Sequence, residues 1–255
     1  MNSRRLTLTA LAGIPLVKPG DDLAALLLAA LQSTDIVAND GDILVVAQKI
    51  VSKAEGRIVN LNEIVPCLHA LALAKEVDKD PRLVEIILSE SSEVVRRHKG
   101  VLIVAHRLGF VMANAGVDRS NSGEGDDELV VLLPRDPDAS AAALKAKLDQ
   151  CCQAKIGVII NDSFGRAWRN GVVGVALGAA GVPSLRNMVG ISDLFGRKMQ
   201  VTEVALADEI AAAASLLMGQ AAEALPAVHV RGFACEAPPL PAAALLRPKE
   251  MDLFR

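Results

Sequence analysis

Aromatic side chains are scarce in this sequence of 255 residues, which contains five phenylalanines, one tryptophan and no tyrosine. Proteins that bind single-stranded nucleic acid stack the bases on aromatic side chains, and this chain has few of them. A surplus of positive charge is also missing, because 27 lysines and arginines stand against 30 aspartates and glutamates. Since binding to nucleic-acid phosphates needs an excess of basic side chains, we expect no nucleic-acid partner.

Long apolar runs and paired cysteines are absent as well. No stretch reaches the roughly 18 apolar residues of a membrane span. Residues 6–17 follow two arginines in the manner of a short signal sequence, but Gly13 and Pro15 interrupt them and no small-residue cleavage site follows. Without a Cys-x-x-Cys pair, the cysteines are best interpreted as free thiols; they are Cys67, Cys151, Cys152 and Cys235. We therefore expect a cytoplasmic protein without a membrane partner.

Three common site motifs are missing from the sequence. It contains no Gly-x-x-x-x-Gly-Lys-Ser/Thr phosphate loop, no Gly-x-Gly-x-x-Gly dinucleotide fingerprint and no Gly-x-Ser-x-Gly nucleophile elbow. The four histidines have no zinc-ligand spacing. If the chain binds phosphate or a hard metal ion, it therefore does so through residues outside these known motifs.

The chain length fits one large domain or two small lobes, and no repeat or low-complexity linker divides it. Periodicity and turn residues predict strands at 7–10, 42–47, 101–105, 110–113, 129–133, 156–160, 201–204 and 227–230. They predict helices at 22–31, near 66, from 80–81, at 139–151 and at 207–219. Because these elements do not alternate strictly, we expect an α+β fold with mixed sheets and helices in a two-lobed, interwoven protomer, with residues 1–255 as one unit.

One polar cluster follows the apolar run 156–160. Asn161, Asp162 and Ser163 stand at the expected edge of a buried strand, where a carboxylate and a hydroxyl are suitable ligands for a hard divalent cation. Arg166 and Arg169 are close enough in sequence to face one polyphosphate. The alternative is that Asp162 caps a helix with a solvated basic face.

Two further clusters contain similar residue types. In residues 114–121, a strand leads into a loop with Asp118, Arg119 and Asn121, although such side chains also satisfy their own backbone in turns. After the helix at 207–219, Gln220 offers an amide oxygen or belongs to an ordinary polar turn.

Two stretches near the N-terminus complete the set. Residues 13–17 form a rigid apolar loop that can hold a ring, or a turn entering the core. Residues 48–57 combine Lys49, Lys53 and Arg57, which suits phosphate, while the alternative is an exposed hairpin.

Five motifs in this order resemble the coenzyme F420-0:L-glutamate ligase (gamma-glutamyl ligase) family over nearly the whole chain. They are Gly-Ile-Pro-Leu at 13–16, Ser-Lys-Ala-Glu-Gly-Arg at 52–57, Asn-Ala-Gly-Val-Asp-Arg-Ser-Asn at 114–121, Asp-Ser-Phe-Gly-Arg at 162–166 and Asp-Leu-Phe-Gly-Arg at 193–197.

The resemblance implies a homodimeric enzyme that uses GTP as a substrate, with Mn2+ or Mg2+ and with K+ as a further candidate ion. It implies that L-glutamate is joined to coenzyme F420-0, with further gamma-linked glutamates added in many members. By position, the catalytic and metal-binding carboxylates are Asp118 and Asp162, and the remaining metal ligands are Ser163 and Gln220. The nucleotide contacts fall on Ile14, Pro15, Leu16, Val17, Gln48, Lys49, Lys53, Asn121, Met218, Gly219, Gln220, Ala221, Ala222, Glu223, Ala224 and Leu225.

The chemistry agrees with these residue types. Forming an amide in water requires an activated carboxylate, and transfer of a γ-phosphoryl group to give an acyl phosphate activates it. We expect catalysis by positioning and electrostatics, without a covalent protein nucleophile. Two alternatives stay open: a metal- and nucleotide-dependent amide ligase acting on another carboxylate, and a non-catalytic module that binds a flavin-like cofactor. Arg166, Arg169 and Arg197 are candidates for holding the acceptor and glutamate.

Overall fold

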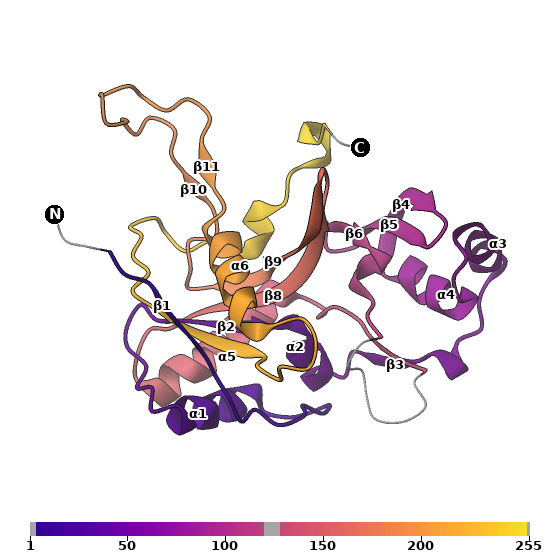
Figure 1. Ribbon diagram of the computed structural model, residues 1–255, viewed down its shortest axis with the longest axis horizontal. Coiled ribbons are helices and arrows are strands. Elements are labelled where there is room, and N and C mark those ends of the chain that lie inside the picture. Colours follow the sequence, from indigo (N-terminus) through magenta and orange to yellow (C-terminus); the bar gives the residue numbers. More distant parts are fainter. Residues whose placement is uncertain (1–3, 120–127, 254–255) are drawn as a thin grey trace.

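The computed structural model describes residues 4–119 and 128–253 and is built around a five-stranded sheet (Figure 1). The strand order is β1-β12-β2-β8-β9, and within this sheet the pair β2–β8 is parallel. The strands are β1 (Thr7–Ala10), β12 (Ala227–Arg231), β2 (Ile43–Ala47), β8 (Gly157–Arg166) and β9 (Arg169–Ala180). With its mixed and antiparallel sheets and its interspersed helices, the molecule has the α+β fold expected from the sequence.

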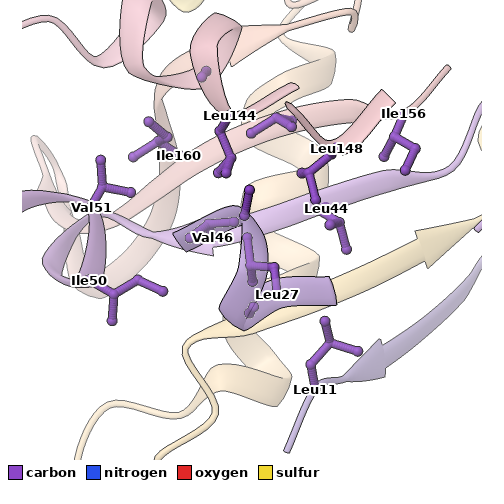
Figure 2. Close-up of a cluster of buried hydrophobic side chains, with 14 of the residues drawn as sticks. Leu11, Leu27, Leu44, Val46, Ile50, Val51, Leu144, Leu148, Ile156 and Ile160 are labelled. Carbon is purple, nitrogen blue, oxygen red and sulfur yellow. The ribbon is translucent and has the colours of Figure 1, made fainter. Parts of the chain in front are cut away.

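Helices cover both faces of this sheet. On one face lie α1 (Leu23–Ser33), α2 (Gln48–Ala54) and α5 (Pro137–Cys152), and on the other lies α6 (Leu206–Met218). Figure 2 shows Leu27, Leu144 and Leu148 packed with Leu44 on the first face. Burying one such side chain contributes about 1.5–3 kcal/mol, so these two layers fix the position of β8 and of the polar residues that follow Ile160.

A second lobe with its own core projects from one side of the sheet (Figure 1). It contains α3 (Leu68–Val77), α4 (Pro81–Ser89) and the antiparallel strands β4 (Ser91–His98), β5 (Val101–His106) and β6 (Val111–Ala113). The strands β3 (Ile58–Asn60) and β7 (Leu129–Val131) pair where the chain enters and leaves this lobe. Short 3₁₀ helices occur at Leu61–Glu63, Asn114–Gly116, Ala242–Leu245 and Lys249–Met251.

Helix ends follow the expected capping chemistry. The side chain of Asp22 accepts a hydrogen bond from the backbone N–H of Ala24 at 3.1 Å, at the start of α1. Asp80 caps α4, and Pro81 is the first residue of that helix. Gly219 ends α6 with a φ of 72°. The predicted starts of α1 and α4 and the predicted end of α6 are therefore confirmed.

Three local features exclude an alternative or add to the predicted elements. Residues 48–54 form the helix α2, which excludes the alternative of an exposed hairpin. The strand β8 does not end at Ile160 but continues to Arg166, so Asp162 does not cap a helix. The glycine-rich stretch after 168 contains the twelve-residue strand β9, which pairs with β8 along its length.

Two of the glycines of β9, Gly174 and Gly178, are explained by close packing. A Cβ atom on Gly178 would lie 2.2 Å from the backbone oxygen of Pro137, and one on Gly174 would lie 2.1 Å from Oγ of Ser215. The sequence therefore places glycine where α5 and α6 approach this strand most closely.

A long arm leaves the body on the side opposite the second lobe (Figure 1). Its base is the short pair β10 (Arg186–Asn187) and β11 (Glu203–Val204). Near its tip Leu194 and Phe195 are 99% and 90% exposed. Among the described residues, no helix has the length and apolar character required to cross a membrane.

Candidate functional site

A cavity of about 500 Å³ lies where the parallel strands β2 and β8 carry the chain to the same edge of the sheet. Ala47 at the end of β2 pairs with Asn161 of β8, and both line the cavity. In α/β arrangements ligands bind at the carboxyl ends of parallel strands. The polar residues after Ile160 therefore lie at a position suited to binding.

Every described residue to which the family resemblance assigns a metal or nucleotide contact lines this one cavity. The loop before α1 contributes Ile14, Pro15, Leu16 and Val17, and α2 contributes Gln48, Lys49 and Lys53. The segment that follows the 3₁₀ helix Asn114–Gly116, here called the lobe connection, contributes Asp118, and β8 contributes Asp162 and Ser163. The end of α6 and the loop after it contribute Met218, Gly219, Gln220, Ala221, Ala222, Glu223, Ala224 and Leu225. Asn121 lies outside the described residues.

Asp118 is held at the cavity by its backbone. Its N–H donates to the carbonyl oxygen of Val131 at 3.0 Å, and its carbonyl oxygen accepts from the N–H of Val131 at 2.8 Å. The carboxylate of Asp118 forms an ion pair with Nζ of Lys49 at 2.7 Å. Because Lys49 is in the first turn of α2, this pair joins the lobe connection to the wall of the cavity.

Asp162 is the carboxylate with the most unusual environment. Burial raises its pKa to about 6, and the negative charge of Asp118 acts in the same direction. A backbone hydrogen bond at Ser163, the charge of Lys49 and a side-chain hydrogen bond from Gln48 oppose this rise. A buried carboxyl beside a second carboxyl favours a cation or a proton between them.

Gln48 links Asp162 to the body of α2. Its side chain is 3% exposed, and its Oε1 accepts a hydrogen bond from Oγ of Ser52 at 2.9 Å. Its side chain also hydrogen-bonds Asp162. The predicted nucleotide contact Gln48 therefore orients a carboxylate in this structure.

The two lysines of α2 give the cavity positive charge. Burial lowers the pKa of Lys53, and the nearby charge of Lys49 lowers it further. Lysine side chains in such a position bind phosphate oxygens as point charges.

The loop after α6 has a tight and specific shape. The carboxylate of Glu223 accepts a hydrogen bond from the backbone N–H of Ala221 at 2.8 Å. Gly219 has a φ of 72°, a backbone conformation that residues with a side chain rarely adopt, so this turn favours glycine. The exposed Gln220 is held within that loop.

Five further residues line the cavity that the sequence did not identify as site residues: Ala47, Ile50, Asn161, Ser215 and Pro226. Asn161 is 5% exposed, and its Nδ2 donates to Oγ of Ser215 at 3.0 Å and approaches Sδ of Met218 at 3.4 Å. The polar triplet 161–163 contained the signal for Asn161. Nothing in the apolar sequence of α6 distinguished Ser215.

The three arginines considered for the acceptor and glutamate do not line the cavity. Arg166 and Arg169 face each other across the turn between β8 and β9, and Arg197 lies in the arm. All three are exposed.

The donor set of the cavity suits a hard cation. Within residues 4–119 and 128–253, no group of three or more His, Cys, Asp or Glu side chains forms a metal site. The candidate ligands in the cavity are instead the carboxylates of Asp118 and Asp162, the hydroxyl of Ser163 and the amide of Gln220, while the third carboxylate, that of Glu223, accepts a hydrogen bond from Ala221. Oxygen donors of this kind are the ligands that Mg2+ and Mn2+ prefer.

Comparison with known proteins places this site in a family context. A family model described as F420-0:Gamma-glutamyl ligase matches residues 13–232. The Coenzyme F420:L-glutamate ligase of Methanothermobacter thermautotrophicus is 47% identical over 98% of this chain and 99% of its own length. Proteins with the same name from Methanopyrus kandleri and Methanocaldococcus jannaschii are 46% and 42% identical, over 94% and 85% of this chain and 93% and 85% of their own lengths.

Proposed function

Because the chain belongs to the F420-0:gamma-glutamyl ligase family, we propose that it joins L-glutamate to coenzyme F420-0 by an amide bond. GTP supplies the phosphoryl group, and further gamma-linked glutamates are added to the product. The observation that carries this proposal is the convergence of two carboxylates, two lysines and the loop after α6 on one cavity.

The reaction that fits this cavity has two steps. The γ-phosphoryl group of GTP is transferred to the terminal carboxylate of coenzyme F420-0, which gives an acyl phosphate and GDP. The amine of glutamate then attacks the acyl carbon; the new C–N bond forms, the C–O bond to phosphate breaks, and the amine proton passes to solvent. Lys49 and Lys53 bind the phosphate oxygens and stabilise the charge on the group in transfer.

A divalent cation, Mn2+ or Mg2+, fits the donors of this cavity, with K+ as a further candidate. Asp118 and Asp162 would hold it, together with the hydroxyl of Ser163 and the amide of Gln220. When bound, such an ion neutralises charge on the phosphates. Gln48 keeps Asp162 oriented for this role through its hydrogen bond.

The proposed mechanism uses no covalent protein nucleophile. All four cysteines are free thiols, and none of them lines the cavity. A variant with all four replaced by serine should therefore keep its ligase activity, whereas loss of activity in a folded variant would refute this part of the mechanism. The free thiols also support our proposal that the protein works in the cytoplasm.

The first experiment incubates the purified protein with coenzyme F420-0, L-glutamate, GTP and Mn2+. Mass spectrometry of the coenzyme should show the gain of one or more glutamates, matched by GDP in chromatography. Formation of GDP without this product would favour an amide ligase that acts on another carboxylate.

If neither product nor GDP forms, the non-catalytic binding module becomes the better interpretation. Such a module binds the coenzyme without a metal, so Asp118→Asn should leave its affinity for coenzyme F420-0 unchanged. In the proposed ligase, by contrast, the same variant loses the metal-dependent reaction.

We also propose that the protein is a homodimer. The arm presents Leu194 and Phe195 almost fully to solvent, together with Val201 at 86% exposure. Exposed apolar side chains gathered on one projecting segment are characteristic of interaction surfaces. A second copy of the chain is the occupant that the family resemblance supports.

A further inference from the structure

Arg57 lies at the junction between the body of the molecule and the second lobe. It follows α2 and directly precedes β3, and in Figure 1 β3 lies between α2 of the body and α4 of the second lobe. The sequence pattern grouped Arg57 with Lys49 and Lys53 as a candidate for binding phosphate. Unlike the two lysines, Arg57 does not line the cavity. Its role therefore has to be sought in its contacts with the protein.

The backbone of Arg57 joins two elements that carry the site. Its N–H donates to the carbonyl oxygen of Ser52 at 2.8 Å, which closes the end of α2. Its carbonyl oxygen accepts from the N–H of Leu132 at 2.9 Å. The preceding residue, Val131 of β7, holds Asp118 through two backbone hydrogen bonds. Arg57 thus lies between the helix that carries the lysines of the cavity and the strand that holds Asp118.

The side chain of Arg57 extends this connection to the second lobe. Nε donates to the carbonyl oxygen of Leu133 at 2.9 Å, and Nη2 forms an ion pair with Glu90 at 2.7 Å. The side chains of Arg57 and Glu90 are only 12% and 11% exposed. Because a guanidinium group is planar and its donors point in fixed directions, these two contacts together fix residues 132–133 relative to Glu90.

Glu90 is itself held firmly by the second lobe, at the end of α4. Its carbonyl oxygen accepts from the backbone N–H of Arg107 at 2.9 Å, and its carboxylate accepts from Nε of the same residue at 3.1 Å. Nε2 of the buried His106 lies 3.5 Å from that carboxylate. Burial would raise the pKa of Glu90, but contacts with three basic side chains outweigh burial and lower the pKa to about 2. Glu90 is therefore a charged and well-fixed partner for Arg57.

Stability alone does not explain this buried ion pair. The attraction between two buried charges is largely offset by the free energy that their removal from water costs, so apolar side chains of similar size often stabilise a fold equally well. The second lobe already has an apolar core of its own. What Arg57 adds is direction, because its contacts link α2, the end of β7 and α4 at one point.

We propose that Arg57, with Glu90 as its partner, is a positioning residue for Asp118, an inference that rests on the role of Asp118 in the proposed function. Arg57 acts through the end of β7, where Val131 holds the backbone of Asp118. Without this link, the carboxylate of Asp118 shifts relative to α2 and to Asp162. The divalent cation that the two carboxylates would hold then binds more weakly.

The first test measures Mn2+ binding to Arg57→Lys by calorimetry, without substrates. Lysine keeps the positive charge beside Glu90 but cannot donate in two fixed directions. Losing a group that orients a metal ligand typically weakens metal binding by about 10- to 100-fold, so the variant should bind Mn2+ at least about tenfold more weakly. Since Arg107 still contacts Glu90, the variant should keep its fold, which circular dichroism checks.

Arg231→Lys is the matched control. Arg231 also combines a carboxylate with a backbone carbonyl, because it contacts Asp42 through Nε and Nη2 and donates to the carbonyl oxygen of Val37. It lies on β12 and does not line the cavity. This control should bind Mn2+ with wild-type affinity. An equal loss of affinity in both variants would show a general disturbance and would overturn the inference.

A double-mutant cycle tests whether Glu90 acts through Arg57. Glu90→Gln keeps the size of the side chain but removes its charge, and it should weaken Mn2+ binding in the same way as Arg57→Lys. The two changes combined should add little to either one, because both break the same link. Fully additive losses would overturn the assignment of Glu90 as the partner.

A crystal structure of Arg57→Lys separates this inference from the proposed function, since it needs neither metal nor substrate. The ion pair between Asp118 and Lys49, which is 2.7 Å long in the wild type, should be longer or broken. An unmoved Asp118, or wild-type Mn2+ affinity in the folded variant, overturns the inference. A wild type that binds no Mn2+ refutes the metal site of the proposed function, whereas a displaced Asp118 in the variant still establishes the positioning role.

Discussion

At the scale of single residues, the site depends on carboxylates that cannot stay charged without compensation. Asp118 has the ammonium group of Lys49 at 2.7 Å. Asp162 has no comparable ion pair among the contacts described, and burial together with Asp118 raises its pKa to about 6. A divalent cation between the two carboxylates would replace the proton and satisfy both groups.

Removing one of these carboxylates tests this arrangement. Asp162→Asn should reduce kcat/KM by at least about 100-fold, because the cation of the proposed mechanism would lose a charged ligand. The same variant should bind Mn2+ more weakly in calorimetry. Asp78→Asn is the control, because Asp78 is an exposed residue of the second lobe in a left-handed conformation that asparagine tolerates. Wild-type Mn2+ affinity in Asp162→Asn would contradict the assignment.

Asp42 shows the opposite shift, far from the cavity. Burial alone would raise its pKa, but hydrogen bonds from Arg231 and His229 outweigh burial and lower the pKa to about 2. The contacts are close, with Nη2 of Arg231 at 2.6 Å and Nε2 of His229 at 2.8 Å. Asp42 thereby connects the start of β2 to the end of β12.

The lowered pKa predicts a pH dependence of stability. A carboxyl whose pKa is depressed in the folded state contributes stability above about pH 4 and loses it as pH falls towards 2. From the shift, this contribution is about 2 kcal/mol. Urea unfolding of Asp42→Asn should therefore show a lower free energy of unfolding at neutral pH and a flatter dependence between pH 4 and pH 2. Parallel curves for the variant and the wild type would be incompatible with this role.

The residues of the site were only partly predictable from the sequence. Motifs identified Asp118 and Asp162, but no spacing rule links two side chains 44 positions apart; the fold brings them together across the lobe connection. Asn161 was recognised as part of a polar cluster but given no role, and Ser215 was missed, because their roles depend on the contact between β8 and α6. A serine in an apolar helix has no local signal for such a contact.

At the scale of elements, local chemistry determined what could be predicted. Aspartate caps and a helical proline act within one turn, so the starts of α1 and α4 were visible in the sequence. The strand β9 was not visible in the sequence, because Gly174 and Gly178 are required by contacts with α6 and α5, which are distant in the chain. The helix α2 was missed for a similar reason: its polar residues face the cavity rather than solvent.

The packing of β9 makes a prediction about one glycine. Gly178→Ala should destabilise the protein by about 1–3 kcal/mol, because its Cβ would lie 2.2 Å from a rigid backbone atom of Pro137. Thermal unfolding should show a lower Tm. The control is Gly165→Ala on the neighbouring strand, where a Cβ meets nothing within 4 Å and the φ is not positive. Equal Tm values for the two variants would argue against tight packing at Gly178.

At the scale of the whole molecule, the arm and the second lobe lie on opposite sides of the central sheet (Figure 1). The second lobe buries its own core of apolar residues, including Leu73, Ile87 and Leu102. The arm leaves Leu194 and Phe195 exposed instead. The exposed surface of the arm is the surface that we propose a second copy of the chain covers.

The proposed homodimer predicts the effect of removing this apolar surface. Leu194→Ser combined with Phe195→Ser should convert the dimer to a monomer, because the burial that favours association is lost with the two side chains. Light scattering after size-exclusion chromatography gives the mass directly. Val65→Ser is the control, since Val65 is 89% exposed on the second lobe and should leave the mass unchanged. A double variant that keeps the wild-type dimer mass would place the interface elsewhere, and a monomeric wild type would refute the homodimer itself.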